Sequence, residues 1–317
     1  MKKLKMFREM GVLVVLAIIV AVLSIISPVF LKPVNLVNIV RQTTEIGIMA
    51  IGMTLLIIAG EMDLSVGSIF GATAMMGALM FKNAMNPTLV FILMLAGGAA
   101  VGFLNGFLVT KAKMPAFIAT LGTMQIFRSV AYAVSGGMSI SVFPEKATNS
   151  WVFKMGGSLG KVPVQVIIML VLFVVAHIVM SKTKFGFDIY ATGGNRRAAK
   201  LAGINTDRIK IECFMLTGAL CALAGMISIA YLQSVPTTAG SGREMDVIAA
   251  VILGGAALSG GRGTILGTFI GAIIMSVVKN GMVLLSVPVF WQSGFIGVII
   301  ILAVLLDTWL GKNEQEK

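Results

Sequence analysis

Six polar side chains stand inside long apolar runs of this sequence and are suited to bind a small polar molecule. They are Glu45, Asp63, Asn105, Gln125, Arg128 and Gln292. Polar groups in such runs are costly and usually face the interior of a helix bundle or a water-filled cavity. The three amides best suit a hydroxyl-rich, neutral solute such as a sugar, which needs several hydrogen bonds but must also be released. Glu45, Asp63 and Arg128 fit equally well as ion pairs that hold helices together.

A compact polar element interrupts the apolar sequence at residues 191–210, ATGGNRRAAKLAGINTDRIK. Asn195 is a favourable helix N-cap, and Gly203 is a favourable left-handed stop, so the spacing predicts a short helix from Arg196 to Ala202. The glycine pair at 193–194 permits a sharp entry into that helix. The sequence therefore predicts a separate, water-exposed helix between two apolar segments.

The predicted short helix has a small apolar face. Ala198, Leu201 and Ala202 share this face through their i, i+3, i+4 spacing, and the two alanines allow a partner surface to approach closely. The element is also basic, and the loops on the cytoplasmic side of membrane proteins are commonly basic. Two interpretations therefore stay open: a docking helix for a partner protein, or an ordinary cytoplasmic loop.

The sequence lacks the residue patterns of an enzyme. It contains no plausibly spaced paired carboxylates, metal-ligand cluster or nucleophile arrangement. It also lacks the G-x-x-x-x-G-K-[ST] phosphate loop, so we expect no ATP site and no cofactor in this chain. The only histidine, His177, lies in an apolar run and is predicted to pack there. Any energy for transport must therefore come from elsewhere.

The composition indicates an all-α polytopic membrane protein with a single domain over residues 1–317. Hydrophobic residues make up 57% and charged residues only 12% of the chain, against about 25% charged residues in soluble domains. The mean hydropathy is +0.98. Apolar runs of about 18–25 residues suit membrane-spanning helices and exceed the strands of an outer-membrane barrel. The net charge of +12 lies mostly at the ends of these runs, which argues for a lipid bilayer and against nucleic acid.

About ten crossings are predicted, with both termini in the cytoplasm. They cover residues 11–30, 43–60, 64–81, 87–110, 115–135, 163–181, 209–232, 244–258, 263–285 and 289–309. This arrangement puts more than twice as many Lys and Arg residues on the cytoplasmic side as outside. It also gives a cytoplasmic loop at about 182–208 and an outer loop at about 136–162. Residues 60–67 and 244–258 are glycine-rich and predict broken or tightly turned helices.

Four long segments, in order and in register, resemble the simple-sugar permeases of bacterial ABC importers, which include ribose, xylose and galactoside types. The segments are GMTLLIIAGEMDLSVGS (52–68), AFIATLGTMQIFRSVAYAVSGG (116–137), YATGGNRRAAKLAGINTDRIK (190–210) and PTTAGSGREMDVIAAVILGGAALSGGRGTILGTFIGA (236–272). The likeness extends over about residues 10–308, and its pattern is nearest to ribose-type permeases. It implies a multi-pass protein of the bacterial inner membrane.

The resemblance also implies partners. An ABC ATPase subunit, which would carry the ATP and Mg, docks on the cytoplasmic loop, and a periplasmic or surface binding protein delivers the sugar to the outer loop. A second copy of the chain, or a sister permease, completes the membrane unit. The residues expected to couple to the ATPase are Gly193, Gly194, Asn195, Arg196, Ala198, Ala199, Leu201, Gly203 and Ile204. Ribose is the first choice of solute, but the resemblance does not fix the sugar.

The main alternative is a secondary transporter driven by protons or sodium. Glu45, Glu61 and Asp63 would then bind the coupling ion, and the broken helices would suit such a protein. An integral membrane enzyme and a passive channel are further alternatives, although the sequence specifies neither a catalytic arrangement nor a selectivity filter.

Overall fold

The computed structural model describes residues 2–315, with side chains described for 11–302, 304 and 305. The helices are α1 (Lys2–Ile26), α2 (Pro33–Ile58), α3 (Val66–Lys82), α4 (Pro87–Thr110), α5 (Ala116–Ser135), α6 (Glu145–Thr148), α7 (Trp151–Lys154), α8 (Val164–Lys182), α9 (Lys184–Gly194), α10 (Arg196–Leu201), α11 (Thr206–Leu232), α12 (Arg243–Leu253), α13 (Ile265–Leu284) and α14 (Val289–Gln315). Two-residue strands β1 (Ile140–Ser141) and β4 (Ser234–Val235) pair antiparallel, as do β2 (Ser158–Leu159) and β3 (Val162–Pro163).

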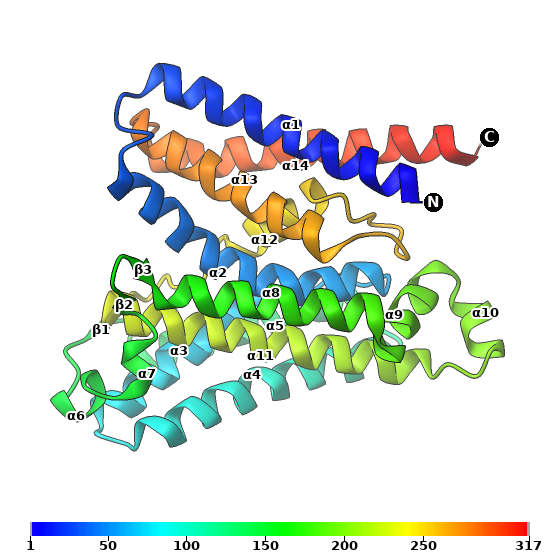
Figure 1. The fold of residues 1–317 in the computed structure, drawn as a ribbon. Coiled ribbons are helices and arrows are strands. Elements are labelled where there is room, and N and C mark those ends of the chain that lie inside the picture. The colour runs from blue at the N-terminus through cyan, green and yellow to red at the C-terminus, as the bar shows by residue number, and fades with distance from the viewer. Residues whose placement is uncertain (1, 316–317) are drawn as a thin grey trace.

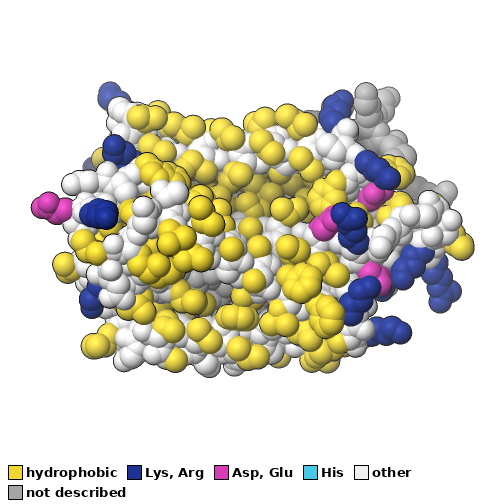
Figure 2. Space-filling view, turned by 90° about the horizontal axis from the view of Figure 1, so that it is seen from below, with side chains coloured by type: hydrophobic (Ala, Val, Ile, Leu, Met, Phe, Trp, Pro, Cys, Tyr) yellow, Lys and Arg dark blue, Asp and Glu magenta, His cyan; other side chains and the backbone are white. Residues whose placement is uncertain are grey.

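The long helices lie roughly side by side, and their exterior suits a membrane. Helices α4, α5, α8, α11 and α13 are each long and apolar enough to cross a bilayer. Charged side chains gather toward the two ends of the molecule, while hydrophobic side chains cover the band between them (Figure 2). Water-facing helices would place charges along such a band, so the distribution supports burial of the band in lipid.

Glycines bring α4 and α11 into backbone contact. Gly98, Gly102 and Gly106 follow one another at every fourth position of α4, and therefore lie on one face. A Cβ atom at Gly98 would overlap the carbonyl oxygen of Gly218 in α11, and one at Gly102 would overlap that of Phe214. Within lipid the hydrophobic effect does not drive helices together, so their association depends on close packing. Small residues such as these glycines permit that close approach.

The two segments predicted to be broken are irregular, but in different ways. Residues 59–65 link α2 to α3, and Asp63, Leu64 and Ser65 within this link are buried. The segment at 244–258 is broken as predicted, because α12 spans only 11 residues, or about 16 Å of a roughly 30 Å core. Its glycine-rich flanks explain the shortening: Gly242 and Gly255 both adopt left-handed backbone angles.

The two ends of the bundle carry different structures (Figure 1). Helices α9 and α10 lie at one end, where both chain termini also lie. This agrees with the predicted placement of the termini on the side of the polar element, while the orientation in a membrane stays a prediction. The opposite end carries α6, α7 and the short strands, which form a folded cap rather than an open loop. Phe81 packs edge-on against Phe143 and Phe153 there, with ring centroids 6.3 and 5.1 Å away.

Candidate functional site

The predicted short helix is present as α10, and its cap is confirmed. The side-chain oxygen of Asn195 accepts a hydrogen bond from the backbone nitrogen of Ala198 at 3.0 Å. Gly203 adopts φ +84° just after the helix. One element was missed: α9 precedes α10, so Gly193 and Gly194 end a helix instead of forming an entry loop. Thr183 caps α9 by accepting from the nitrogen of Gly186 at 3.3 Å.

The exposed face of α10 matches the predicted apolar face. Leu201 is 90% exposed, an unusual position for a large apolar side chain in water, and Ala198 and Ala202 are exposed beside it. Ala199 is different, since it is only 5% exposed. A buried side chain cannot touch a partner directly, so a coupling role of Ala199 would act through the packing of α10, and this role stays a prediction. Its methyl group packs α10 against the rest of the chain.

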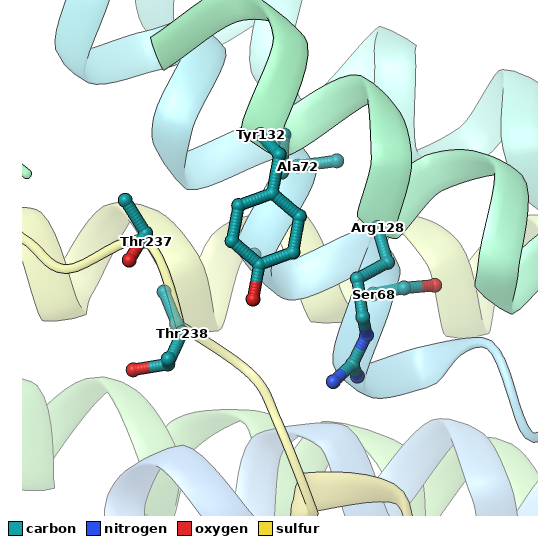
Figure 3. A pocket seen from close by; sticks show the side chains of 9 residues that line it. Ser68, Ala72, Arg128, Tyr132, Thr237 and Thr238 are labelled. Atoms are coloured by element: carbon teal, nitrogen blue, oxygen red, sulfur yellow. The ribbon is translucent and has the colours of Figure 1, made fainter. Parts of the chain in front are cut away.

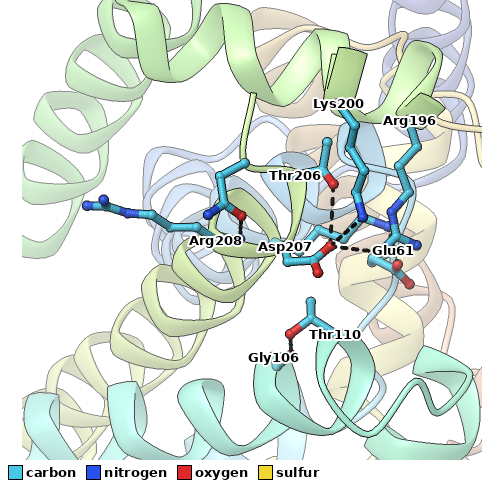
Figure 4. A network of polar contacts seen from close by, with 10 residues as sticks. Glu61, Gly106, Thr110, Arg196, Lys200, Thr206, Asp207 and Arg208 are labelled. Atoms are coloured by element: carbon cyan, nitrogen blue, oxygen red, sulfur yellow. Dashed lines mark hydrogen bonds and ion pairs between the residues drawn. The ribbon is translucent and has the colours of Figure 1, made fainter. Parts of the chain in front are cut away.

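Two ion pairs hold α10 to the first turn of α11. The carboxylate of Asp207 lies 2.9 Å from the guanidinium of Arg196 and 3.5 Å from the ammonium of Lys200. Figure 4 shows all three side chains converging between the two helices. Each pair is partly exposed and therefore contributes modestly on its own, but two cations on one carboxylate restrict how α10 can tilt. The apolar face is thereby presented in a fixed orientation.

Four glycines join the polar element to the membrane helices. A Cβ atom at Gly193 would overlap the carbonyl oxygen of Ile58, the last residue of α2. The same carbonyl accepts a hydrogen bond from the nitrogen of Gly261 at 2.8 Å. Gly60 and Gly260 flank this contact in left-handed conformations. We call these residues, Gly60, Gly193, Gly260 and Gly261, the glycine junction. Through it, α9 touches both the end of α2 and the loop that leads into α13.

Tyr190 adds a side-chain link at the same place. Its hydroxyl donates to the carbonyl oxygen of Gly263 at 2.8 Å. Burial raises the pKa of this phenol, so the group stays protonated and able to donate at neutral pH. A movement of α9 would therefore pull on the backbone directly before α13.

A buried ion pair ties the 59–65 link to α11. The ammonium of Lys210 donates to the carboxylate of Glu61, and the side chains are only 6% and 15% exposed. Lys210 belongs to the basic element of the sequence, but it points inward and not toward water. Glu61 was one of the acids considered for binding a coupling ion, and it is engaged by this partner.

Replacing Lys210 by methionine is expected to destabilise the protein by about 3 kcal/mol, because the Glu61 carboxylate would stay buried without its partner. Thermal unfolding in detergent would measure the loss. The double change Lys210→Met with Glu61→Leu removes both charges and should recover most of the stability. An unchanged unfolding temperature in the single variant would contradict a buried pair.

A second group of polar residues converges on α5. The guanidinium of Arg128 donates to the Ser241 hydroxyl at 2.7 Å and lies 3.9 Å from the Glu244 carboxylate. Figure 3 shows Tyr132 beside it, with both side chains directed at the chain that carries Thr237 and Thr238. Ser68 of α3 lines the same pocket. We call Ser68, Arg128, Tyr132, Thr237 and Thr238 the hydroxyl-rich pocket.

The hydroxyl-rich pocket is small and partly open, since Tyr132 is 41% exposed. Its volume is about 10 Å³, close to that of a single water site. One guanidinium and four hydroxyl groups are the donors and acceptors that a sugar requires. A sugar would fit only after α5 and the 236–242 segment separate. This arrangement is therefore a narrow polar site and not a preformed binding cavity.

Of the six predicted pathway residues, Gln125 and Arg128 lie near each other on α5, and Asn105 is hydrogen-bonded to Asp63. Gln125 is exposed one turn before Arg128 on α5, and Tyr132 continues the same face one turn later. Sequence reasoning missed Tyr132 and the two threonines, because hydroxyl groups are common in membrane helices. Consecutive threonines before a glycine-rich stretch, PTTAGSG, were the available signal.

The other predicted pathway residues have structural partners. Glu45 accepts from Arg243 at 2.5 Å. Asp63 is fully buried and accepts from the nitrogen and hydroxyl of Ser65 at 2.7 and 2.5 Å. Asn105 donates to Asp63 at 3.2 Å. Gln292 donates to the carbonyl oxygen of Val287 at 3.1 Å, at the start of α14. Glu45 and Asp63 thus have partners within the chain, as expected for groups that hold helices together.

Within the part of the chain that the structure describes, no three His, Cys, Asp or Glu side chains are grouped to hold a metal ion. The polar clusters therefore consist of hydrogen bonds and ion pairs.

Comparison with known proteins identifies the family. A family model described as branched-chain amino acid transport system, permease component, matches residues 35–304. The chain belongs to this permease family. Among individual relatives, the ribose import permease protein of Bacillus subtilis is 42% identical over 302 residues, covering 95% of this chain and 92% of the relative. The ribose import permease protein of Escherichia coli K12 is also 42% identical, covering 94% and 93%.

Two further similar proteins have lower sequence identity to this chain. The autoinducer 2 import system permease protein of Photorhabdus luminescens is 34% identical, covering 94% of this chain and 89% of the relative. A solved chain of a metal-chelate type ABC transporter, in an inward-facing conformation, aligns with a TM-score of 0.54 and 18% identity, covering 94% of this chain and 98% of that one. This structural likeness concerns the fold alone. The resemblance to the sugar permeases drawn from the four segments is confirmed by the permease family match and by the ribose import relatives.

Proposed function

We propose that this chain is the membrane permease subunit of an ABC importer for a monosaccharide, with ribose the first candidate, and that a separate subunit hydrolyses the ATP. The identity of 42% to ribose import permeases over nearly the whole chain carries this proposal. The relatives' names favour a sugar over the branched-chain amino acids of the family description. The apolar band and the multi-pass helices support a place in the bacterial inner membrane.

The docking site for the ATPase is the exposed face of α10. Leu201, Ala198 and Ala202 form a small exposed apolar surface. The positively charged side chains of Arg196 and Lys200 lie around it. Asp207 fixes the helix in place, and the glycine junction connects it to α2 and α13. A push on α10 would therefore reach two membrane helices through backbone contacts, which transmit displacement with little loss.

The outer cap is the contact for the binding protein. Residues 136–162 pack on the ends of α3 and α11, and Met138, Val142 and Leu159 expose large apolar side chains there. Scattered exposed apolar residues are normal on protein surfaces, but three on one short cap at the end opposite α10 suit a partner that arrives from outside. A second copy or a sister permease would complete the pathway beside α5, most of which is unburied by this chain.

The solute passes the hydroxyl-rich pocket. Its hydroxyl and guanidinium groups can form hydrogen bonds with sugar hydroxyls, which replace bonds that these groups make to water or within the chain at little net cost. The ion-coupled alternative receives less support, since Glu45, Glu61 and Asp63 all have partners within the chain.

The general test is solute uptake in vesicles that contain this chain, its ATPase and its binding protein. We expect ribose uptake that requires ATP and survives a protonophore. Uptake that persists without the ATPase and collapses with the protonophore would replace the proposal by an ion-coupled transporter.

The pocket is tested by Tyr132→Phe, which removes one hydroxyl and keeps the ring. We expect the KM for ribose uptake to rise about fivefold to tenfold at an unchanged amount of protein in the membrane, as the loss of one hydrogen bond predicts. Tyr231→Phe is the matched control, because Tyr231 is exposed to a similar degree but packs beneath Arg41. Equal KM values for the two variants would exclude Tyr132 from the pathway.

A further inference from the structure

An apolar groove runs between α8 and the start of α13. It is lined by Leu170, Phe173, Val174, His177, Ile178, Ile265, Leu266 and Phe269, and has a volume of about 330 Å³. Cavities of roughly 300–1,000 Å³ hold small-molecule ligands. His177 was expected to pack inside the bundle, but its side chain is exposed on this groove. The groove is distinct from both the docking face and the hydroxyl-rich pocket.

The floor of the groove is rigid and its walls are open to the surroundings. Phe173 and Phe269 meet edge to face with ring centroids 4.9 Å apart, and Ile265 is buried beside them. Val174 on one wall and Leu266 on the other are about half exposed. Since α8 and α13 are both apolar enough to cross a membrane, the groove opens toward hydrocarbon. Its natural occupant is therefore an acyl chain.

Positive charges lie at one end of this groove. On α8, Val174, Ile178 and Lys182 follow one another at every fourth position, so Lys182 continues the wall to the end of the helix. Lys184 follows at the start of α9, and Arg262 precedes Ile265 by three residues on the other side. All three cationic residues are exposed. Long basic side chains at the end of a membrane helix extend toward headgroups, where they attract anionic lipids.

We propose that this groove binds one anionic phospholipid, with an acyl chain on the Phe173–Phe269 floor and the phosphate beside Lys182. The lipid would sit in the leaflet next to α9 and α10. It would touch α8, which leads into α9, and α13, whose preceding loop belongs to the glycine junction. The bound lipid would thereby brace the two helices that meet the ATPase-docking element. The site does not depend on which solute is transported.

The acyl-chain seat is tested with Val174→Trp, which fills the groove. Val175→Trp is the matched control, because Val175 is the next residue of the same helix but does not line the groove. The two side chains are similarly exposed, at 50% for Val175 and 59% for Val174. The full chain, purified in detergent, is titrated with phosphatidylglycerol and followed by native mass spectrometry. We expect one tightly bound lipid in the natural chain and in Val175→Trp, and loss of that lipid in Val174→Trp. Equal binding by both tryptophan variants would overturn the proposal.

The headgroup seat is tested with phosphatidylcholine that carries the same acyl chains. We expect the natural chain to prefer phosphatidylglycerol, and Lys182→Gln to lower this preference about fivefold, as expected for one basic residue near the surface. Lys111→Gln, an exposed lysine just beyond α4, should leave it unchanged. Equal affinity of the natural chain for both lipids would show that the site does not select for headgroup charge. This result would overturn the proposal that the groove binds an anionic lipid.

Discussion

Substituting glutamate for Leu201 is expected to abolish ATP-driven uptake while leaving the protein in the membrane. Leu201 is 90% exposed at the centre of the small apolar face of α10. A central apolar anchor of this kind commonly contributes about 2 kcal/mol or more to an interface, and a buried charge would add a desolvation cost. The ATPase subunit should therefore bind at least about 30-fold more weakly. Co-purification of the ATPase with the tagged permease measures the loss.

Two controls separate docking from general damage. Leu201→Met keeps an apolar side chain of similar size and should retain the ATPase. Leu159→Glu makes the same change at a leucine that is 67% exposed on the outer cap, at the opposite end of the molecule. It should retain the ATPase as well. If Leu201→Glu co-purifies with as much ATPase as the natural chain, α10 is an ordinary loop helix and not the dock.

Replacing Gly193 by alanine is expected to lower uptake at least tenfold and the unfolding temperature by about 5 °C. The new methyl group would overlap the carbonyl oxygen of Ile58, which is backbone and cannot rotate away. Either α9 shifts or the hydrogen bond from Gly261 to Ile58 is lost. Overpacking of this kind costs about 1–3 kcal/mol, and each kcal/mol shifts the unfolding temperature by about 2–4 °C in a protein somewhat smaller than this one.

Gly194→Ala provides a matched control for this prediction. A Cβ atom at Gly194 meets nothing within 4 Å, and the residue has no left-handed backbone angle. The two variants differ only in which of two adjacent glycines receives the methyl group. We expect Gly194→Ala to transport and unfold like the natural chain. Similar effects of both changes would mean that helix propensity, and not the junction, accounts for the loss.

Local signals in the sequence predicted local structure well. Asn195 and Gly203 mark the ends of α10 because capping depends on residues within one turn. The all-helical membrane class followed from composition in the same way. Helix α9 escaped prediction, since KFGFDIYATGG contains three glycines and three aromatic residues, which favour helix only weakly. Tertiary contacts at Gly193 and Tyr190 hold it in place.

Long-range partners could not be predicted from one sequence. Glu45 and Arg243 are 198 residues apart, and Glu61 and Lys210 are 149 apart. Their residue types fit a solute pathway as well as an ion pair, so only the fold decides between these roles. The same holds for α12, because the sequence indicated a broken crossing at 244–258 but could not give the length of the helix or the turns at 237–242 before it. Tyr132 became a candidate only when the fold placed it opposite Thr237 and Thr238.

The glycine face between α4 and α11 has a mechanical consequence. Where the backbones touch, no side chain lies between the helices that could change rotamer and absorb a displacement. The two helices must therefore tilt together as one rigid unit. With 27 residues, α11 is about 40 Å long. It begins at the ion pairs that hold α10 and ends beside β4, which pairs with the cap strand β1. A tilt imposed at the end that carries α10 would therefore also move the outer cap, where we propose that the binding protein docks.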